Sequence, residues 1–199
     1  AEYELTLEPK ILADQLDYRM GRKRPSWTLA DFEFSHKKKD PAQQRFSYLL
    51  TAFAGEAHAE TGIASTKIEL AREELGRYLV QRHAGELDDA PTPRRQRRKQ
   101  KRATAQSAHP LCPDAKTLDF FLARLLGFLS FQHYEAFALF ELLPAWLRFL
   151  ARHGLLDEAA RQHTLQEISY IKGELKTFAE NQVNDPALAV NLAGWPDER

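Results

Sequence analysis

A dense run of positive charge occupies residues 94–102, which read Arg-Arg-Gln-Arg-Arg-Lys-Gln-Lys-Arg. Seven of these nine positions are cationic, in a chain of 199 residues with no formal net charge at pH 7. A block of like charges repels itself and cannot be buried, so it marks a solvated interaction segment or a linker. Lys and Arg gain binding free energy by releasing counterions from a polyanion, and Arg adds bidentate phosphate contacts. The run therefore predicts phosphate contacts with DNA or RNA that carry no base specificity.

Two smaller basic clusters, at 22–24 and 37–39, extend this pattern. The three clusters hold 13 of the 28 Lys and Arg residues, so the rest of the chain is acidic. We predict nucleic-acid binding by residues 94–102 with help from 22–24 and 37–39, and the alternatives for the long run are a solvated spacer or a targeting signal. The predicted binding residues are Arg94, Arg95, Arg97, Arg98, Lys99, Lys101, Arg102, Arg22, Lys23, Arg24, Lys37, Lys38 and Lys39.

Aromatic side chains lie among the smaller basic clusters, namely Trp27, Phe32, Phe34 and His36. Single-stranded nucleic acid is bound by such mixtures, because cations follow the backbone while aromatic rings stack on bases. The competing interpretation, which we favour, is that rings at nearly alternate spacing face a hydrophobic core.

Residues 57–68 have the spacing of a helix-turn-helix, with Gly62 in the turn and Ile63 and Ile68 after it. In such a motif the second helix would lie in the major groove of DNA. Any tight helical hairpin needs a similar Gly and flanking apolar residues. Acidic side chains on the second helix also oppose contact with a duplex, so a plain hairpin is favoured.

Few residues have the types and spacing of a catalytic site. Cys112 follows His109 by three positions, but a nucleophilic thiolate needs a fixed base and a lowered pKa. His133 and Glu135 could act as a general acid–base pair, although a buried structural histidine is the more common case. There is no Gly-x-Ser-x-Gly elbow and no phosphate-binding or dinucleotide-binding loop. The sequence favours a non-enzymatic protein and assigns no catalytic residue.

Metal-ligand spacing is equally sparse. Two ligands on one helical face are usually three or four residues apart, as His163 and Glu167 are, and as Glu56 and Glu60 are. Neither pair has a matching second pair, and isolated helical pairs of this kind are usually surface contacts. We therefore expect no metal and no cofactor.

The elements that position these residues are predicted to be helices. The apolar periodicity indicates a mainly α fold, a bundle of five to six helices, with a short two-stranded β-ribbon near the N-terminus from residues 3–7 and 27–34. The alternative for residues 27–34 is a short helix capped by Ser26. Residues 1–85 form an N-terminal half, irregular and β-prone over 1–40 and a helical hairpin over 41–84. Residues 86–113 are a basic, Pro-containing flexible linker. Residues 114–199 form a C-terminal helical half that packs with the first as one domain.

Local signals place several helix boundaries. Pro41 suits a first helical position, and Gly85 suits a stop after the second helix of the hairpin. Asp114 and Asp157 are good N-caps. We expect helix over 114–153, with a kink or a new start at Pro144, and a last long helix over about 158–182.

The apolar excess of residues 118–150 predicts a protein–protein interface. Phe128, Phe131, Trp146 and Phe149 are its predicted interface residues. The alternative function to nucleic-acid binding is therefore a helical adaptor or oligomerisation module, with a second copy or another protein as partner.

Composition limits the remaining possibilities. Hydrophobic residues make up 43% of the chain, which is enough for a buried core. The single cysteine excludes an intrachain disulfide and fits a reducing compartment, so we expect a cytoplasmic protein. The first residues lack a basic stretch followed by an apolar one, so no signal peptide is expected. The longest stretch without charge, 125–134, is too short for a membrane span.

Overall fold

The structure of the chain is a computed structural model, which describes residues 26–32, 41–61, 63–87, 109–127, 130, 132–183 and 185–196. Within these ranges the fold is mainly helical and has no strand, so the predicted mainly α class is confirmed. The six α-helices of this part are α2 (Pro41–Thr61), α3 (Ser65–Ala84), α5 (Ala115–Leu125), α6 (His133–Arg152), α7 (Glu158–Phe178) and α8 (Pro186–Ala193). A 3-10 turn, η1 (Leu29–Phe32), precedes α2, and a π-helical turn, η2 (Ala179–Val183), follows α7.

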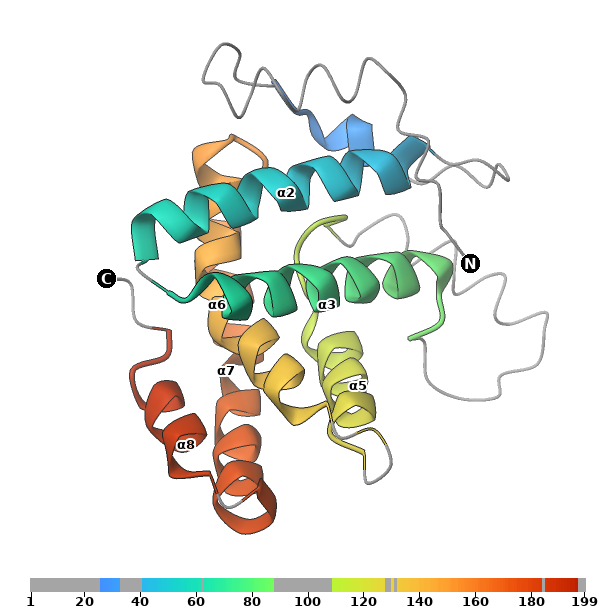
Figure 1. Ribbon diagram of the computed structural model, residues 1–199. Coiled ribbons are helices and arrows are strands. Elements are labelled where there is room, and N and C mark those ends of the chain that lie inside the picture. The colour runs from blue at the N-terminus through green and yellow to red at the C-terminus, as the bar shows by residue number, and fades with distance from the viewer. Residues whose placement is uncertain are drawn as a thin grey trace, which may run out of the picture.

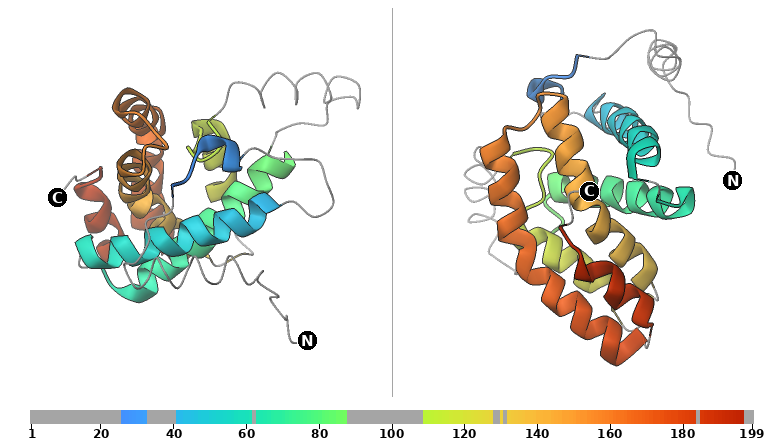
Figure 2. Two further views of the ribbon diagram at one scale, coloured as in Figure 1. Left: turned by 90° about the horizontal axis from the view of Figure 1, so that it is seen from above. Right: turned by 90° about the vertical axis from the view of Figure 1, so that its left-hand side faces the viewer.

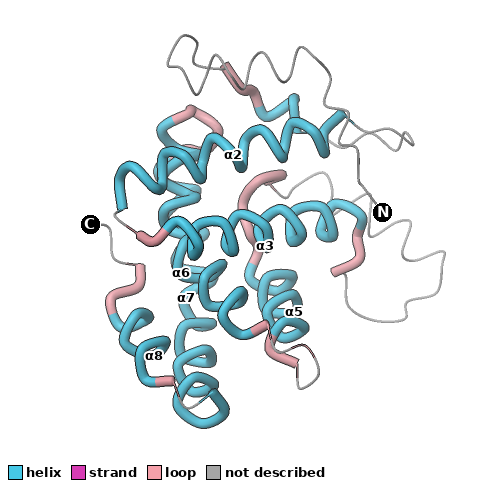
Figure 3. Tube along the Cα trace, in the orientation of Figure 1, coloured by secondary structure: helices cyan, strands magenta, loops and turns pink. Residues whose placement is uncertain are grey.

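Helix α6 is the centre of the fold, since it packs against α2, α3, α5, α7 and α8. Helices α2 and α3 lie side by side and antiparallel, and they cross α6 (Figure 1). Helix α7 runs beside α6, while α5 and α8 flank its lower part (Figure 2). The described loops between the helices are short (Figure 3).

Aromatic side chains from both halves of the chain build one continuous hydrophobic core. Phe53 of α2 meets Trp146 and Phe149 of α6, with ring centroids 5.2 and 5.7 Å apart. Burying each such side chain stabilises the fold by roughly 1.5–3 kcal/mol. The hairpin α2–α3 therefore covers α6 instead of standing apart from it.

The predicted helix over 114–153 is two helices. Helix α5 ends at Leu125 and α6 begins at His133, and Gly127, a poor helix former, lies in the break. A kink or a new helix was expected at Pro144, and no new helix begins there, because α6 runs through that residue.

Trp195 explains why Pro144 is tolerated inside α6. Proline has no N–H, so the carbonyl of Phe140, four residues earlier, has no helical partner. The Nε1–H of Trp195 donates to that carbonyl oxygen at 3.0 Å. The indole also stacks on the ring of Phe140, with centroids 4.6 Å apart. The segment after α8 thus replaces the hydrogen bond that Pro144 removes.

The predicted N-terminal ribbon is not supported. Its second strand was placed over 27–34, where the structure has the helical turn η1. The carboxylate of Asp31 accepts from the N–H of Thr28 at 2.9 Å and closes this turn. Phe32 is fully buried against Phe46. The predicted first strand, residues 3–7, lies outside the described residues.

Aspartates begin three of the helices. Asp114 accepts from the N–H of Thr117 at 3.0 Å, and Asp157 accepts from that of Ala160 at 2.7 Å. Both N-caps were predicted and are confirmed. Asp185 starts α8 in the same way. The predicted last long helix ends as an α-helix at Phe178 and continues as η2.

We expect Trp195→Phe to lower the free energy of unfolding by about 1–3 kcal/mol, because it leaves the Phe140 carbonyl buried and unpaired. Chemical denaturation followed by circular dichroism would measure the change. Pro144→Ala is the matched partner, since it restores an N–H at residue 144. Trp195→Phe should cost less in the Pro144→Ala background. Equal costs in both backgrounds would contradict the compensation.

Candidate functional site

The start of α2 and the end of α3 lie together at one end of the antiparallel hairpin (Figure 1). The rings of Phe46 and His83 confirm this, with centroids 5.5 Å apart. Gly85 ends α3 in the left-handed conformation, at φ 67°, which favours glycine. We call this region, the start of α2 and the end of α3, the hairpin end. There the described chain meets residues 33–40 and 88–108.

Arg82 binds the chain that follows residues 88–108 to the hairpin end. Its Nη1 donates to the carbonyl oxygens of His109, at 3.2 Å, and Cys112. Its Nε lies 3.0 Å from Oδ2 of Asp114, the N-cap of α5. Only 11% of the Arg82 side chain is exposed. One mostly buried guanidinium therefore joins α3 to the segment 109–114.

Both described ends of the predicted linker 86–113 belong to the core. Leu87, Leu111 and Cys112 are buried. His83 donates from Nε2 to the carbonyl of Pro110 at 3.1 Å. The packed chain thus extends to Leu87 and resumes at His109, while residues 88–108 of the predicted linker lie outside the described residues.

Residues 26–32 cover the start of α2 (Figure 2). Nη1 of Arg45 donates to the carbonyl of Asp31 at 3.0 Å. The ring of Trp27 lies 5.7 Å from that of Tyr48. The chain that enters and leaves η1 is therefore held against the same end of α2.

The thirteen predicted basic residues, in clusters 22–24, 37–39 and 94–102, lie outside the described residues. The structure describes the residues that flank them. These are Ser26 after the first cluster, Phe32 and Pro41 around the second, and Leu87 and His109 around the third.

The predicted interface residues do not form an exposed face. Trp146 and Phe149 have no exposed surface. Trp146 donates from Nε1 to the carbonyl of Leu111 at 3.0 Å, so both its ring and its N–H are used inside the fold. Helices α2 and α3 cover the apolar surface that the sequence offered to a partner. Phe128 and Phe131 lie outside the described residues.

Two weaker nucleic-acid hypotheses, base stacking and a helix-turn-helix, depend on residues that are buried or wrongly oriented in the structure. Phe32 is fully buried and Trp27 is partly buried against the core, so these rings are not free for bases. Phe34 and His36 lie outside the described residues. Helices α2 and α3 pack antiparallel along their length, whereas a helix-turn-helix crosses at roughly 90–120°. Residues 57–68 are therefore interpreted as part of a plain helical hairpin and not as a DNA-reading helix-turn-helix.

Cys112 and His109 are adjacent but have structural roles. Burial raises the pKa of the Cys112 thiol to about 12, so the thiolate is scarce at neutral pH. Nδ1 of His109 accepts from the N–H groups of Leu111 and Cys112, both at 3.2 Å. Nε2 therefore carries the proton and donates to the carbonyl of Leu155 at 2.8 Å. Both ring nitrogens are occupied by the backbone, so His109 offers no base to the thiol.

Buried carboxylates lie where α3 meets α6. Glu141 pairs with Lys67, and Glu74, only 3% exposed, accepts from Nη1 of Arg77 at 2.6 Å. Burial raises the pKa of both carboxyl groups. The pair of Glu141 and Lys67 joins α6 to α3, whereas Arg77, the partner of Glu74, belongs to the same helix α3. His133, the other acid–base candidate, begins α6 with its ring 4.4 Å from that of Tyr134.

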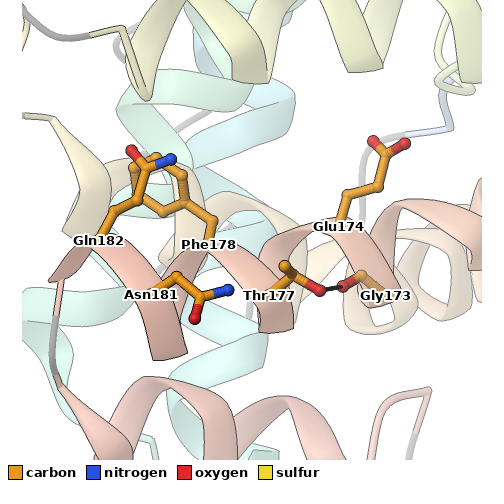
Figure 4. A pocket seen from close by; sticks show the side chains of 6 residues that line it. All are labelled: Gly173, Glu174, Thr177, Phe178, Asn181 and Gln182. Atoms are coloured by element: carbon orange, nitrogen blue, oxygen red, sulfur yellow. Dashed lines mark hydrogen bonds between the residues drawn. The ribbon is translucent and has the colours of Figure 1, made fainter.

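Two adjoining hollows lie along the end of α7, with volumes of about 380 and 370 Å³, and only the second is also lined by α5. They share Glu174, Phe178 and Gln182, and the first also borders Asn181 of η2 (Figure 4). We call them together the α5–α7 groove. Its other lining residues are Asp119, Leu122, Ala123, Leu126, Ile171, Gly173, Leu175 and Thr177. Neither hollow contains His133 or Glu135.

The described residues hold no cluster of metal ligands and no membrane-spanning helix. His, Cys, Asp and Glu side chains there do not gather in groups of three that could hold a metal ion. His163 and Glu167 form an exposed pair, with Nδ1 and Oε2 3.5 Å apart. No helix in the same part of the chain is long and apolar enough to cross a membrane.

Comparison of the chain with protein-family models, curated proteins and solved structures finds no match. Function has to be argued from this chain's own residues. Two surfaces carry such an argument, the hairpin end and the α5–α7 groove. Sequence patterns indicated neither Arg82 nor the groove, because both depend on contacts between distant segments.

We expect the stability of the fold to decrease as the pH falls below about 6.5, in part through His109. Burial lowers the pKa of this imidazole from its usual value of 6.5. The unfolded chain then takes up a proton that the folded chain refuses. Its contribution is present above the unfolded pKa and is lost as the pH falls through the folded pKa.

Urea denaturation at several pH values would test this expectation. His109→Asn should be less stable than wild type at pH 7.5 and should show a smaller loss between pH 7.5 and 5. His163→Asn is the control, because that side chain is 71% exposed and should leave the pH dependence unchanged. An unaltered slope in His109→Asn would refute the assignment.

Proposed function

We propose that this protein binds nucleic acid through phosphate contacts, made by its three basic clusters and largely independent of base sequence. The observation that carries the proposal is that the described residues flanking the second and third clusters lie at the hairpin end. Trp27, beside the first cluster, packs on Tyr48 in the same half of α2 and on His153 at the end of α6. A polyanion gains from cations that can reach it together.

The reach of the chain limits where the two smaller clusters can lie. Lys39 is two residues from Pro41, the first residue of α2, and so within about 7 Å of it. Arg24 is two residues from Ser26, next to Trp27, which packs on Tyr48. Tyr48 itself is about 10 Å along α2 from Pro41. These lengths support a common location for the two clusters.

The same argument applies to the long run. Arg94 follows Leu87 by seven residues and Arg102 precedes His109 by seven, so neither lies more than about 25 Å from its attachment. Arg82 and His83 hold the second attachment beside the first. Over 25 Å a duplex presents roughly 15 phosphates, so all thirteen cations can meet one stretch of nucleic acid.

The charge of the described helices supports the same location for the nucleic acid, at the hairpin end. Acidic side chains outnumber basic ones among the described residues. A nucleic acid would be repelled by most of this surface and attracted at the hairpin end. Neutrality of the whole chain is therefore compatible with polyanion binding.

We expect binding to DNA or RNA to weaken steeply with salt. Seven phosphate contacts from 94–102 contribute about −6 to the log–log slope on duplex DNA. Replacing all seven cations by Gln should remove that part of the slope. A fluorescence-anisotropy titration at several salt concentrations, with single- and double-stranded probes, would measure it.

Matched triple substitutions sharpen the test. Replacing Lys37, Lys38 and Lys39 by Gln, or Arg22, Lys23 and Arg24, should each reduce the slope by about 3. Replacing three cations of the described helices, Arg72, Lys116 and Lys176, should leave the salt slope unchanged. Salt-insensitive binding, or equal effects of body and cluster variants, would rule the proposal out.

A second proposal is an adaptor or oligomerisation role. The originally expected interface at Trp146 and Phe149 is buried, so that role needs another surface. The α5–α7 groove is the observation that favours it, because its apolar floor is open to solvent.

A further inference from the structure

The α5–α7 groove is an elongated surface along two helices that contact each other. Its α5 wall, from Asp119 to Leu126, rises about 11 Å, and its other wall, from Ile171 to Gln182, rises about 17 Å. A helix advances about 5.4 Å per turn, so about two to three turns of a further helix would lie along these walls. The dimensions therefore suit a helical segment better than a compact small molecule.

The floor of the groove is apolar and only partly covered by the chain itself. Leu122 and Leu175 are buried at its base, while Leu126 and Phe178 are only partly buried. Removing apolar surface from water contributes about 25 cal/mol per Å² to binding free energy before the costs of association. A partner with an apolar face would therefore be stabilised on this floor.

Two carboxylates stand on the rim of the groove, Asp119 on the α5 wall and Glu174 on the α7 wall. Burial, and then the negative charge of these two carboxylates, raises the pKa of Tyr170, so both charges act on the same end of the groove. In the part of the chain that the structure describes, neither carboxylate forms an ion pair, whereas Glu180 pairs with Lys176. The rim therefore offers negative charge that no ion pair compensates.

The other end of the groove is polar and uncharged. Gln182 follows Phe178 along α7, with Asn181 beside it (Figure 4). Both amides belong to the π-helical turn η2, and π-helical turns occur frequently at functional sites. A side-chain amide can hydrogen-bond to the unpaired backbone groups at the end of a bound helix.

This combination selects the chemistry of the partner. Nucleic acid and anionic lipid surfaces would be repelled by the carboxylates of the rim. A helix that binds in a groove presents apolar anchors at every third or fourth position. Charge complementarity to Asp119 and Glu174 requires Lys or Arg beside those anchors.

We propose that the α5–α7 groove binds a basic amphipathic helix of another protein. The apolar face of that helix covers Leu126 and Phe178, and its cations pair with Asp119 and Glu174. The inference rests on the adaptor role proposed above and gives that role a partner of defined chemistry. It is independent of nucleic-acid binding, which uses the basic clusters.

Two designed peptides test the inference on the full chain. Each has about 16 residues, enough for measurable helicity, and carries Leu at every third or fourth position. The leucines are bordered by Lys in one peptide and by Glu in the other. Isothermal titration calorimetry at low salt should show that the wild-type chain binds the Lys peptide at least about tenfold more tightly than the Glu peptide.

Substitutions in the groove locate the binding site. Ala123→Arg places a large cation at an exposed groove position and should weaken binding of the Lys peptide about tenfold or more. Reversing both rim charges, Asp119→Lys with Glu174→Lys, should invert the preference in favour of the Glu peptide. Glu69→Lys with Glu167→Lys is the matched control, because it makes the same change in net charge at exposed positions outside the groove and should leave the preference unchanged. Circular dichroism would show that each variant is folded.

The unfavourable outcomes are distinguishable. Binding of the Lys peptide that Ala123→Arg leaves unchanged would place the contact outside the groove and overturn the inference. Equal affinity of the wild-type chain for both peptides would overturn the basic partner and leave the adaptor role standing. Binding of neither peptide would remove the inference and the adaptor role together. Self-association of the wild-type chain that Ala123→Arg abolishes would make a second copy the occupant and also overturn the inference.

Discussion

The buried guanidinium of Arg82 is the contact on which the arrangement at the hairpin end depends. It binds two backbone carbonyls, of His109 and Cys112, and the carboxylate of Asp114. Charge-assisted hydrogen bonds of this kind contribute about 1.5–3 kcal/mol each. They fix the end of α3, the turn at 109–113 and the start of α5 together. Lysine could not serve three acceptors in this planar pattern.

Sequence periodicity predicted the helices well where apolar spacing is local. Phe46, Leu49 and Phe53 mark the inner face of α2, and all three are buried. Asp114 and Asp157 cap α5 and α7 because a cap needs only a side chain and an N–H three residues away. The mainly α fold follows from such local signals.

The remaining features depend on long-range partners. Pro144 was expected to kink the helix or to begin a new one because it lacks an N–H, but Trp195 supplies the missing donor from a distant segment. Trp146 and Phe149 were assigned to an interface because the sequence reveals an apolar excess without revealing which helices cover it. The α5–α7 groove was not predicted, for the opposite reason. Phe178 lies on the predicted inner stripe of α7, yet the packing leaves it partly uncovered.

The turn at 109–113 also bears on how far the number of residues between Leu87 and His109 can vary. Arg82 and His83 of α3 bind the carbonyls of His109 and Pro110, so the packed helices hold the two ends of this segment side by side. The entropic cost of bringing two chain positions together grows only logarithmically with the number of residues between them, so doubling that number costs about 0.6 kcal/mol. Insertions, deletions and changes of charge can therefore accumulate there at little cost to folding. The body acts as a fixed frame on which this segment can diversify through evolution.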